Sequence, residues 1–95
     1  IMALQILEKN GTFELYGNLN TKTSRLFIIH FEYLINTLKN VTINIDKIKA
    51  IDPSGFEAFK TLIAISLKNK GILYIIGKGC KDIYANNSKT FAAYE

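Results

Sequence analysis

The chain has 95 residues, of which 48% are hydrophobic and 21% are charged. This length allows one hydrophobic core but not two domains, and the composition is typical of a folded domain rather than a disordered one. The single cysteine excludes a disulfide framework, and one cysteine with one histidine cannot supply the usual four-ligand zinc site. We therefore expect neither a metal nor a cofactor.

The net charge of +4 invites a nucleic-acid interpretation, but the type of basic residue argues against it. Eleven of the twelve basic residues are lysines spread along the chain, although forked contacts to bases and phosphates favour arginine, of which Arg25 is the single example. No apolar run approaches the roughly 20 residues that cross a bilayer, and we expect no secretion signal. These features predict a cytoplasmic protein that neither binds nucleic acid nor inserts into a membrane.

The first residues of the chain predict a β-hairpin. Ala3–Glu8 is predicted to be a short strand, and Thr12–Tyr16 is predicted to be a second one because its apolar and polar side chains alternate. Between them, Asn10 and Gly11 favour a tight turn because both residues tolerate a positive φ. Gly17 is expected to end the second strand.

Lys22–Leu38 is predicted to be a helix with two neighbouring apolar stripes. One stripe contains Leu26, Ile29 and Tyr33, and the other contains Phe27, Phe31, Leu34 and Leu38. Together they cover more than half of the helix surface, so either the helix is well buried or part of it meets a partner. For Phe27, Ile28 and Ile35 we expect packing in the core, and the alternative is an exposed strip for a partner.

The second half of the chain predicts two strands and two helices. Val41–Asp46 alternates and predicts a strand covered on one face, whereas Ile72–Ile76 is apolar throughout and predicts a central strand. Phe56–Lys70 and Cys80–Asn86 are predicted to be helices, and Ser88–Glu95 is too short to assign. The order β-β-α-β-α-β-α predicts one small α/β domain over residues 1–95. We expect a mixed four-stranded sheet with parallel crossovers and with helices mainly on one face.

The segment before the second long helix has the pattern of a helix start. Ser54 and Glu57 have the spacing of a capping box, in which the serine hydroxyl caps the helix. Alternatively, Asp52 is the N-cap and Pro53 takes the first helical position. Both alternatives place the Ser54 hydroxyl in the first turn, near free backbone amides, and both are compatible with a helix start that has no function.

Three landmarks in this chain occur in a particular order on particular elements. They are Gly17-Asn18-Leu19-Asn20 before the first helix, Val41–Asp46 followed by Asp52-Pro53-Ser54-Gly55-Phe56, and Gly71 before Ile72–Ile76. In this order the chain resembles the STAS domain family, which includes the bacterial anti-sigma factor antagonists. The resemblance covers residues 11 to 85 and is most specific over residues 41–77.

The resemblance implies a protein without catalysis of its own. In such antagonists an anti-sigma factor with serine kinase activity phosphorylates the Ser or Thr before the Gly, which is Ser54 here, and a phosphatase resets the switch. The unphosphorylated form binds the anti-sigma factor, and the phosphorylated form releases it. The partner-binding residues implied for this chain are Asn20, Asp46, Lys47, Asp52, Gly55 and Phe56.

The chain departs from the family pattern at three places. Asn20 replaces an acidic residue, and Pro53 replaces the first Ser or Thr of the phosphorylated loop. Ser88–Glu95 leaves little room for the last strand and helix of the family, which we expect to be shortened or missing.

Other candidate sites are weaker. Gly77, Lys78 and Gly79 could form a weak nucleotide or phosphate contact, although the segment lacks a full phosphate-binding motif and a structural turn is the simpler interpretation. His30 and Cys80 have no evident partner for catalysis or metal binding.

Two further function classes remain to be compared with the phospho-switch. The first is a STAS accessory subunit that docks on the ATPase of a phospholipid-transporting ABC complex through the same loop without a kinase. The second is an enzyme, which we do not expect because no catalytic triad, carboxylate pair or metal cluster is evident.

Overall fold

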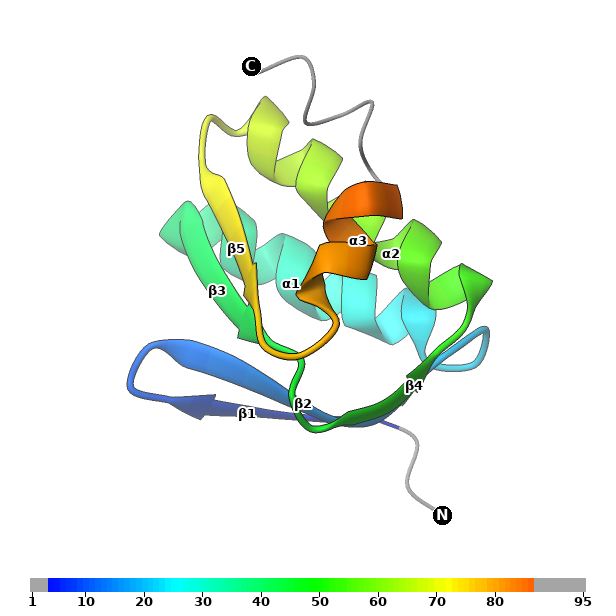
Figure 1. The fold of residues 1–95 in the computed structure, drawn as a ribbon. Coiled ribbons are helices and arrows are strands. Elements are labelled where there is room, and N and C mark those ends of the chain that lie inside the picture. The colour runs from blue at the N-terminus through cyan, green and yellow to red at the C-terminus, as the bar shows by residue number, and fades with distance from the viewer. Residues whose placement is uncertain (1–3, 87–95) are drawn as a thin grey trace.

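The computed structural model of the chain describes residues 4–86. Strands β1 (Leu4–Lys9) and β2 (Thr12–Leu19) form the predicted antiparallel hairpin, at the bottom of Figure 1. Asn10 and Gly11 take positive φ values of 51° and 84° in its turn, as the sequence predicts. Strand β2 continues past Gly17, because its last residues pair with a further strand.

Three parallel strands extend this hairpin into a five-stranded mixed sheet. β3 (Asn40–Asn44) pairs with the first half of β2, and β5 (Ile72–Ile76) pairs with the other edge of β3. β4 (Ile48–Ile51) pairs with the second half of β2. Within residues 4–86, β5 therefore lies at an edge, and the expectation of a central strand is wrong there.

Strand β4 is the fifth strand, one more than the sequence predicts. It has only four residues, and Lys49 and Ala50 in its middle are exposed, so its sequence does not alternate. Its pairing holds it in place, with Ile48 opposite Gly17 and Ile51 opposite Leu19. A strand defined by a partner distant in the sequence leaves little local signal.

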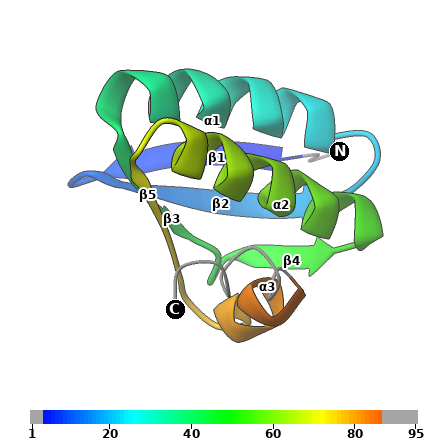
Figure 2. The same ribbon diagram turned by 90° about the horizontal axis from the view of Figure 1, so that it is seen from above.

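Helices α1 (Ser24–Leu38) and α2 (Pro53–Lys68) lie side by side over one face of the sheet (Figures 1 and 2). α3 (Cys80–Asn86) contacts α2 and lies on the side of α2 away from α1 (Figure 2). It closes the core with Ile83, which is fully buried, while the Tyr84 hydroxyl donates to the carbonyl oxygen of Ile75 at 3.1 Å. The prediction of helices mainly on one face is confirmed.

The core lies between the sheet and the two long helices. Phe27, Phe31 and Phe59 are fully buried, with ring centroids 5.1 Å apart for the first two and 5.0 Å apart for Phe27 and Phe59. Ile35 is also buried, so core packing of the second stripe and its neighbours is confirmed for Phe27, Phe31 and Ile35. The first predicted stripe is not buried, because its residues Leu26, Ile29 and Tyr33 are exposed. Leu38, at the end of the helix, is exposed as well.

One polar side chain of α2 is buried without compensation. Among the residues that the structure describes, Ser66 Oγ is buried with no hydrogen-bond partner, and the residue is only 1% exposed. A buried hydroxyl without a partner is destabilising, and alanine also favours a helix more than serine does. We expect Ser66→Ala to raise the free energy of unfolding by about 1 kcal/mol. Chemical denaturation would measure it, and a loss of stability would contradict the buried position of Ser66.

None of the helices within residues 4–86 combines the length and the apolar character needed to cross a membrane. In the same range, no group of three or more His, Cys, Asp and Glu side chains is placed to hold a metal ion. The predictions for Ser88–Glu95 lie outside the described residues.

Candidate functional site

The predicted site lies where the ends of two parallel strands lead into the two long helices. Leu19 at the end of β2 is paired with Ile51 at the end of β4, and the Asp52 N–H donates to the Leu19 carbonyl oxygen at 3.1 Å. The loop before α1 and the start of α2 are therefore neighbours, at the right of Figure 1. This pairing brings together residues that are more than 30 positions apart in the sequence.

Asp52 is the N-cap of α2, so the second of the two capping alternatives is observed. Its Oδ1 accepts a hydrogen bond from the Gly55 N–H at 3.0 Å, and Pro53 occupies the first helical position. Ser54 is then the second residue of the helix, and its hydroxyl does not serve as the cap. α2 begins three residues before the predicted Phe56, because the cap and the proline extend the helix toward the strand.

Gly55 is buried at the crossing of α2 and the end of β2. A Cβ atom there would lie 2.6 Å from Ile51 Cγ2 and 2.7 Å from the Leu19 carbonyl oxygen. Only a glycine allows this close approach of helix and strand. Gly55, which the sequence predicts to bind a partner, is buried here. It fixes the position of its neighbour Ser54 instead.

The Ser54 hydroxyl is hydrogen-bonded to a residue that the sequence did not single out. Its Oγ lies 3.0 Å from Thr21 Oγ1, in the loop before α1. Ser54 is half-buried and Thr21 is exposed, so both hydroxyls lie at the surface of the domain. The contact joins residues 33 positions apart, and nothing in the local sequence around Thr21 indicates it.

Asn20 shapes the loop that carries Thr21. Its Oδ1 accepts from the Lys22 N–H at 2.9 Å, and its carbonyl oxygen accepts from Ser24 Oγ at 2.6 Å. Thr23 Oγ1 accepts from the Asn20 N–H at 2.9 Å and donates to the Asn18 carbonyl oxygen at 2.9 Å. The Asn20 side-chain amide is therefore engaged within its own loop.

Asp46 joins the turn after β3 to the turn after β5. Its Oδ1 accepts from the Lys78 N–H at 2.6 Å, and a Cβ on Gly77 would lie 3.0 Å from the same oxygen. Because the Lys78 amide already donates to a carboxylate, an added phosphate would meet a negative charge there. The phosphate contact at Gly77, Lys78 and Gly79 stays a prediction.

Phe56 belongs to a hollow beside this turn rather than to the Ser54 contact. The hollow has a volume of about 290 Å³, and Phe56, Lys78 and Gly79 are among its lining residues together with β4. The predicted residues therefore fall into two neighbouring groups. Asp52, Ser54 and Gly55 lie at the start of α2, with Asn20 in the loop whose Thr21 contacts Ser54. Asp46, Phe56, Lys78 and Gly79 lie around the turn after β5.

Lys47 lies on the exposed turn after Asp46, and its positive charge contributes to lowering the pKa of Glu14 on the open face of the sheet. Tyr16 Oη donates to Glu14 Oε1 at 2.7 Å, and this hydrogen bond is the main cause that lowers the pKa of Glu14. Lys9, whose Nζ lies 3.5 Å from Glu14 Oε1, lowers the pKa further, and Lys47 does so from a greater distance. Lys9, Glu14 and Tyr16 thus form a polar cluster on the open face of the sheet.

Removing the Tyr16 hydroxyl should raise the pKa of Glu14 toward its ordinary value. A lowered pKa in the folded state means that the ionised carboxylate stabilises the fold above the unfolded-state pKa. This contribution is lost as the pH falls through the lowered value. In Tyr16→Phe this contribution should be smaller and its loss should be complete at a higher pH, and NMR titration of the Glu14 carboxyl carbon measures the rise of the pKa. Tyr33→Phe, which removes an exposed phenol from α1, should leave the titration unchanged, and an unchanged titration in Tyr16→Phe would contradict the assignment.

No protein-family model matches the sequence, and no curated protein sequence matches it either. The structure, however, is similar to that of the anti-sigma factor antagonist SpoIIAA in its unphosphorylated form, with a TM-score of 0.66. The match covers 87% of this chain and 82% of that chain, at 12% sequence identity. The likeness confirms the predicted small α/β fold of the STAS kind, with its mixed sheet and three helices.

Proposed function

We propose that the chain is a phosphorylation-controlled docking protein of the anti-sigma factor antagonist kind. It binds an anti-sigma factor with serine kinase activity while Ser54 is free, and it releases this partner when Ser54 is phosphorylated. The observation that carries the proposal is the surface hydroxyl of Ser54 in the first turn of α2, beside the Asp52 cap. The fold, which is similar to that of an anti-sigma factor antagonist, supports the same proposal.

The first turn of α2 can carry a phosphate without loss of the fold. A helix N-terminus favours negative charge, by about 0.3–1 kcal/mol at an exposed position. Because Asp52 and not Ser54 caps the helix, modification of Ser54 leaves the cap bond to Gly55 in place. Phosphorylation would remove only the Thr21 hydrogen bond, which is exposed.

The same phosphate would act strongly on a docked partner. It adds a charge of about −1.5 to −2 to a surface that already carries the Asp52 carboxylate. A partner that covers Ser54 would have to bury this charge, so its affinity falls while the domain stays folded. The switch needs no catalytic group in this chain, since the kinase and the phosphatase are separate proteins.

Phosphate transfer to the full chain tests the proposal directly. Wild type, Ser54→Ala and Thr61→Ala would each be incubated with ATP and a lysate of the source cells. Thr61 is the matched control, because it is an exposed hydroxyl of the same helix, seven residues further on. We expect phosphate on wild type and Thr61→Ala and none on Ser54→Ala. Equal labelling of wild type and Ser54→Ala, or no labelling of either, would contradict the proposal.

A further inference from the structure

The outward face of α1 is apolar and has no partner within residues 4–86. Leu26, Ile29 and Tyr33 are 70%, 52% and 69% exposed. Their spacing of three and four residues places them on one side of the helix. α2 packs on the other flank of α1, so this side forms an outer border of the domain (Figure 2).

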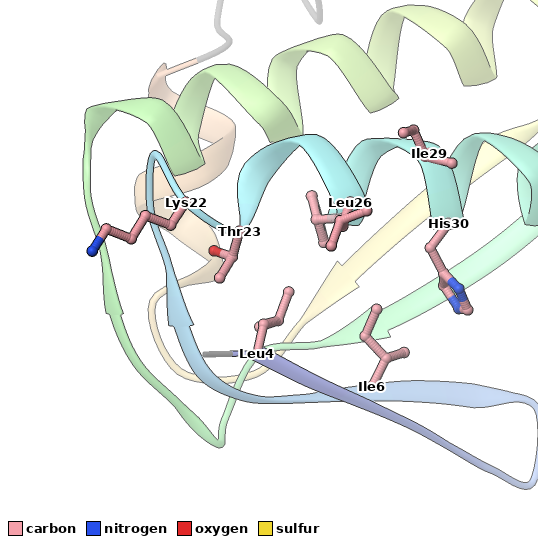
Figure 3. Close-up of a pocket in the computed structure, with 8 residues that line it drawn as sticks. Leu4, Ile6, Lys22, Thr23, Leu26, Ile29 and His30 are labelled. Carbon is pink, nitrogen blue, oxygen red and sulfur yellow. The ribbon is translucent and has the colours of Figure 1, made fainter. Parts of the chain in front are cut away.

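A groove between α1 and β1 continues this apolar face. It has a volume of about 400 Å³, and Figure 3 shows Leu4 and Ile6 of β1 pointing toward α1, with Leu26 above them. His30 points back from α1 toward Ile6. None of the residues predicted for the docking of an anti-sigma factor lines this groove.

The charges beside the apolar face are arranged to complement a second copy of the same helix. The spacing of the apolar residues fits a heptad repeat, with Leu26 and Tyr33 at successive a positions and Ile29 at the d position between them. In the same repeat, the two successive g positions are occupied by Arg25 and Glu32. Both charged residues are exposed. When two such helices run antiparallel, their g positions face each other, so each Arg25 can meet Glu32 of the second copy.

One antiparallel register satisfies the apolar and the charged residues together. Setting Leu26 against Ile29 of the second copy brings Arg25 opposite Glu32, and the two-fold symmetry makes this pair twice. Tyr33 then lies beside the turn that precedes α1 of the second copy. A shift by one heptad would instead place Glu32 against Glu32 and Arg25 against Lys39, so repulsion disfavours it.

We propose that this face of α1, made of Arg25, Leu26, Ile29, Glu32 and Tyr33, is the interface of a symmetric antiparallel homodimer. The stretch of α1 from residue 25 to residue 33 is roughly 14 Å long, which is a small interface. The dimer is therefore weak and forms over a range of about 10 µM to 1 mM. The interface includes neither Ser54, nor Thr21, nor any residue predicted to bind an anti-sigma factor, so a partner and a second copy can bind at the same time.

Charge reversal tests the proposed register. Glu32→Arg and Arg25→Glu each replace two attractive pairs by two repulsive ones and should weaken the dimer about tenfold or more. The double variant Arg25→Glu/Glu32→Arg restores complementary charges and should dimerise like wild type. A mixture of the two single variants should also form a dimer, because one copy then carries two arginines and the other two glutamates. Sedimentation equilibrium of the full chain measures each case.

Matched variants separate the interface from general effects of charge and folding. Glu57→Arg makes the same change of net charge at an exposed position of α2 and should leave the dimer unchanged. Leu26→Ser removes the central apolar contact and should give a folded monomer, as circular dichroism would show. A wild-type chain that stays monomeric at 1 mM, or a double variant as weak as the single ones, would overturn the proposal. Ser54→Asp should leave dimerisation unchanged, so this test is independent of the proposed phospho-switch.

Discussion

Gly55→Ala should destabilise the domain by about 2 kcal/mol, because overpacking of a tight crossing typically costs 1–3 kcal/mol. The new Cβ would lie 2.6 Å from Ile51 Cγ2 and 2.7 Å from the Leu19 carbonyl oxygen, which is backbone and cannot rotate away. Alanine gains some helix propensity over glycine, which offsets part of this cost. Thermal unfolding should show a melting temperature lower by roughly 10 °C.

The neighbouring position provides the control. Ser54→Ala changes a half-buried hydroxyl in the same helical turn and should alter the melting temperature much less, since only the exposed Thr21 hydrogen bond is lost. If Gly55→Ala were as stable as Ser54→Ala, the close crossing of α2 and β2 would be wrong. The start of α2 would then lie further from Leu19 than the structure places it.

Ser54→Asp should lower the affinity for the docking partner by about 100-fold, because a like or unpaired charge at an interface costs several kcal/mol. The stability of the isolated domain should hardly change, since an acidic residue in the first turn of a helix is favourable. The two substitutions at neighbouring positions thus separate two effects. Gly55→Ala lowers stability, and Ser54→Asp lowers binding at nearly constant stability.

A charge placed elsewhere on α2 distinguishes a local from a general effect. Thr61 follows Ser54 by seven residues, so it lies on nearly the same side of the helix and roughly 10 Å further along. Thr61→Asp adds the same negative charge there and should reduce the affinity much less than Ser54→Asp. Equal loss of affinity in both variants would mean that the net charge of α2, and not the Ser54 position, governs docking.

Elements with a strong local pattern could be predicted from the sequence. The hairpin follows from the Asn10-Gly11 turn, and β3 follows from the alternation that buries Val41, Ile43 and Ile45. β4 could not be predicted in this way, because its pairing with the end of β2 and not its own sequence makes it a strand. The position of a strand in the sheet is also set by its partners. The apolar run Ile72–Ile76 predicts a central strand, but β5 lies at an edge of the described sheet, and Ile72 and Ile76 are 50% and 43% exposed.

The buried side of α1 shows a different limit. Both stripes of this helix are apolar, so periodicity alone does not say which one faces the sheet. In the structure, Phe27 and Phe31 are buried and pack with Phe59 and Phe13. Leu26 and Tyr33 are exposed. The alternative that part of the helix meets a partner stays a prediction, and it concerns the exposed first stripe.

At the site, the position of functional groups was more predictable than their contacts. The pattern of residues 52–56 places Ser54 in the first turn of a helix, and the Asp52 cap is one of the two alternatives that the sequence allows. The contact of Ser54 with Thr21 and that of Asp46 with Lys78 span 33 and 32 residues. They depend on the pairing of strand ends, which the local sequence around each residue does not encode.

Pull-down of partners from a lysate of the source cells tests the central claim most directly, with wild type, Ser54→Ala, Ser54→Asp and Thr61→Asp as baits. The phospho-switch predicts that wild type, Ser54→Ala and Thr61→Asp retain a serine kinase of the anti-sigma factor kind, and that Ser54→Asp loses it. Retention of that kinase by Ser54→Asp would contradict the switch. Recovery of an ABC transporter ATPase by all four baits would also contradict it and would favour the accessory-subunit function.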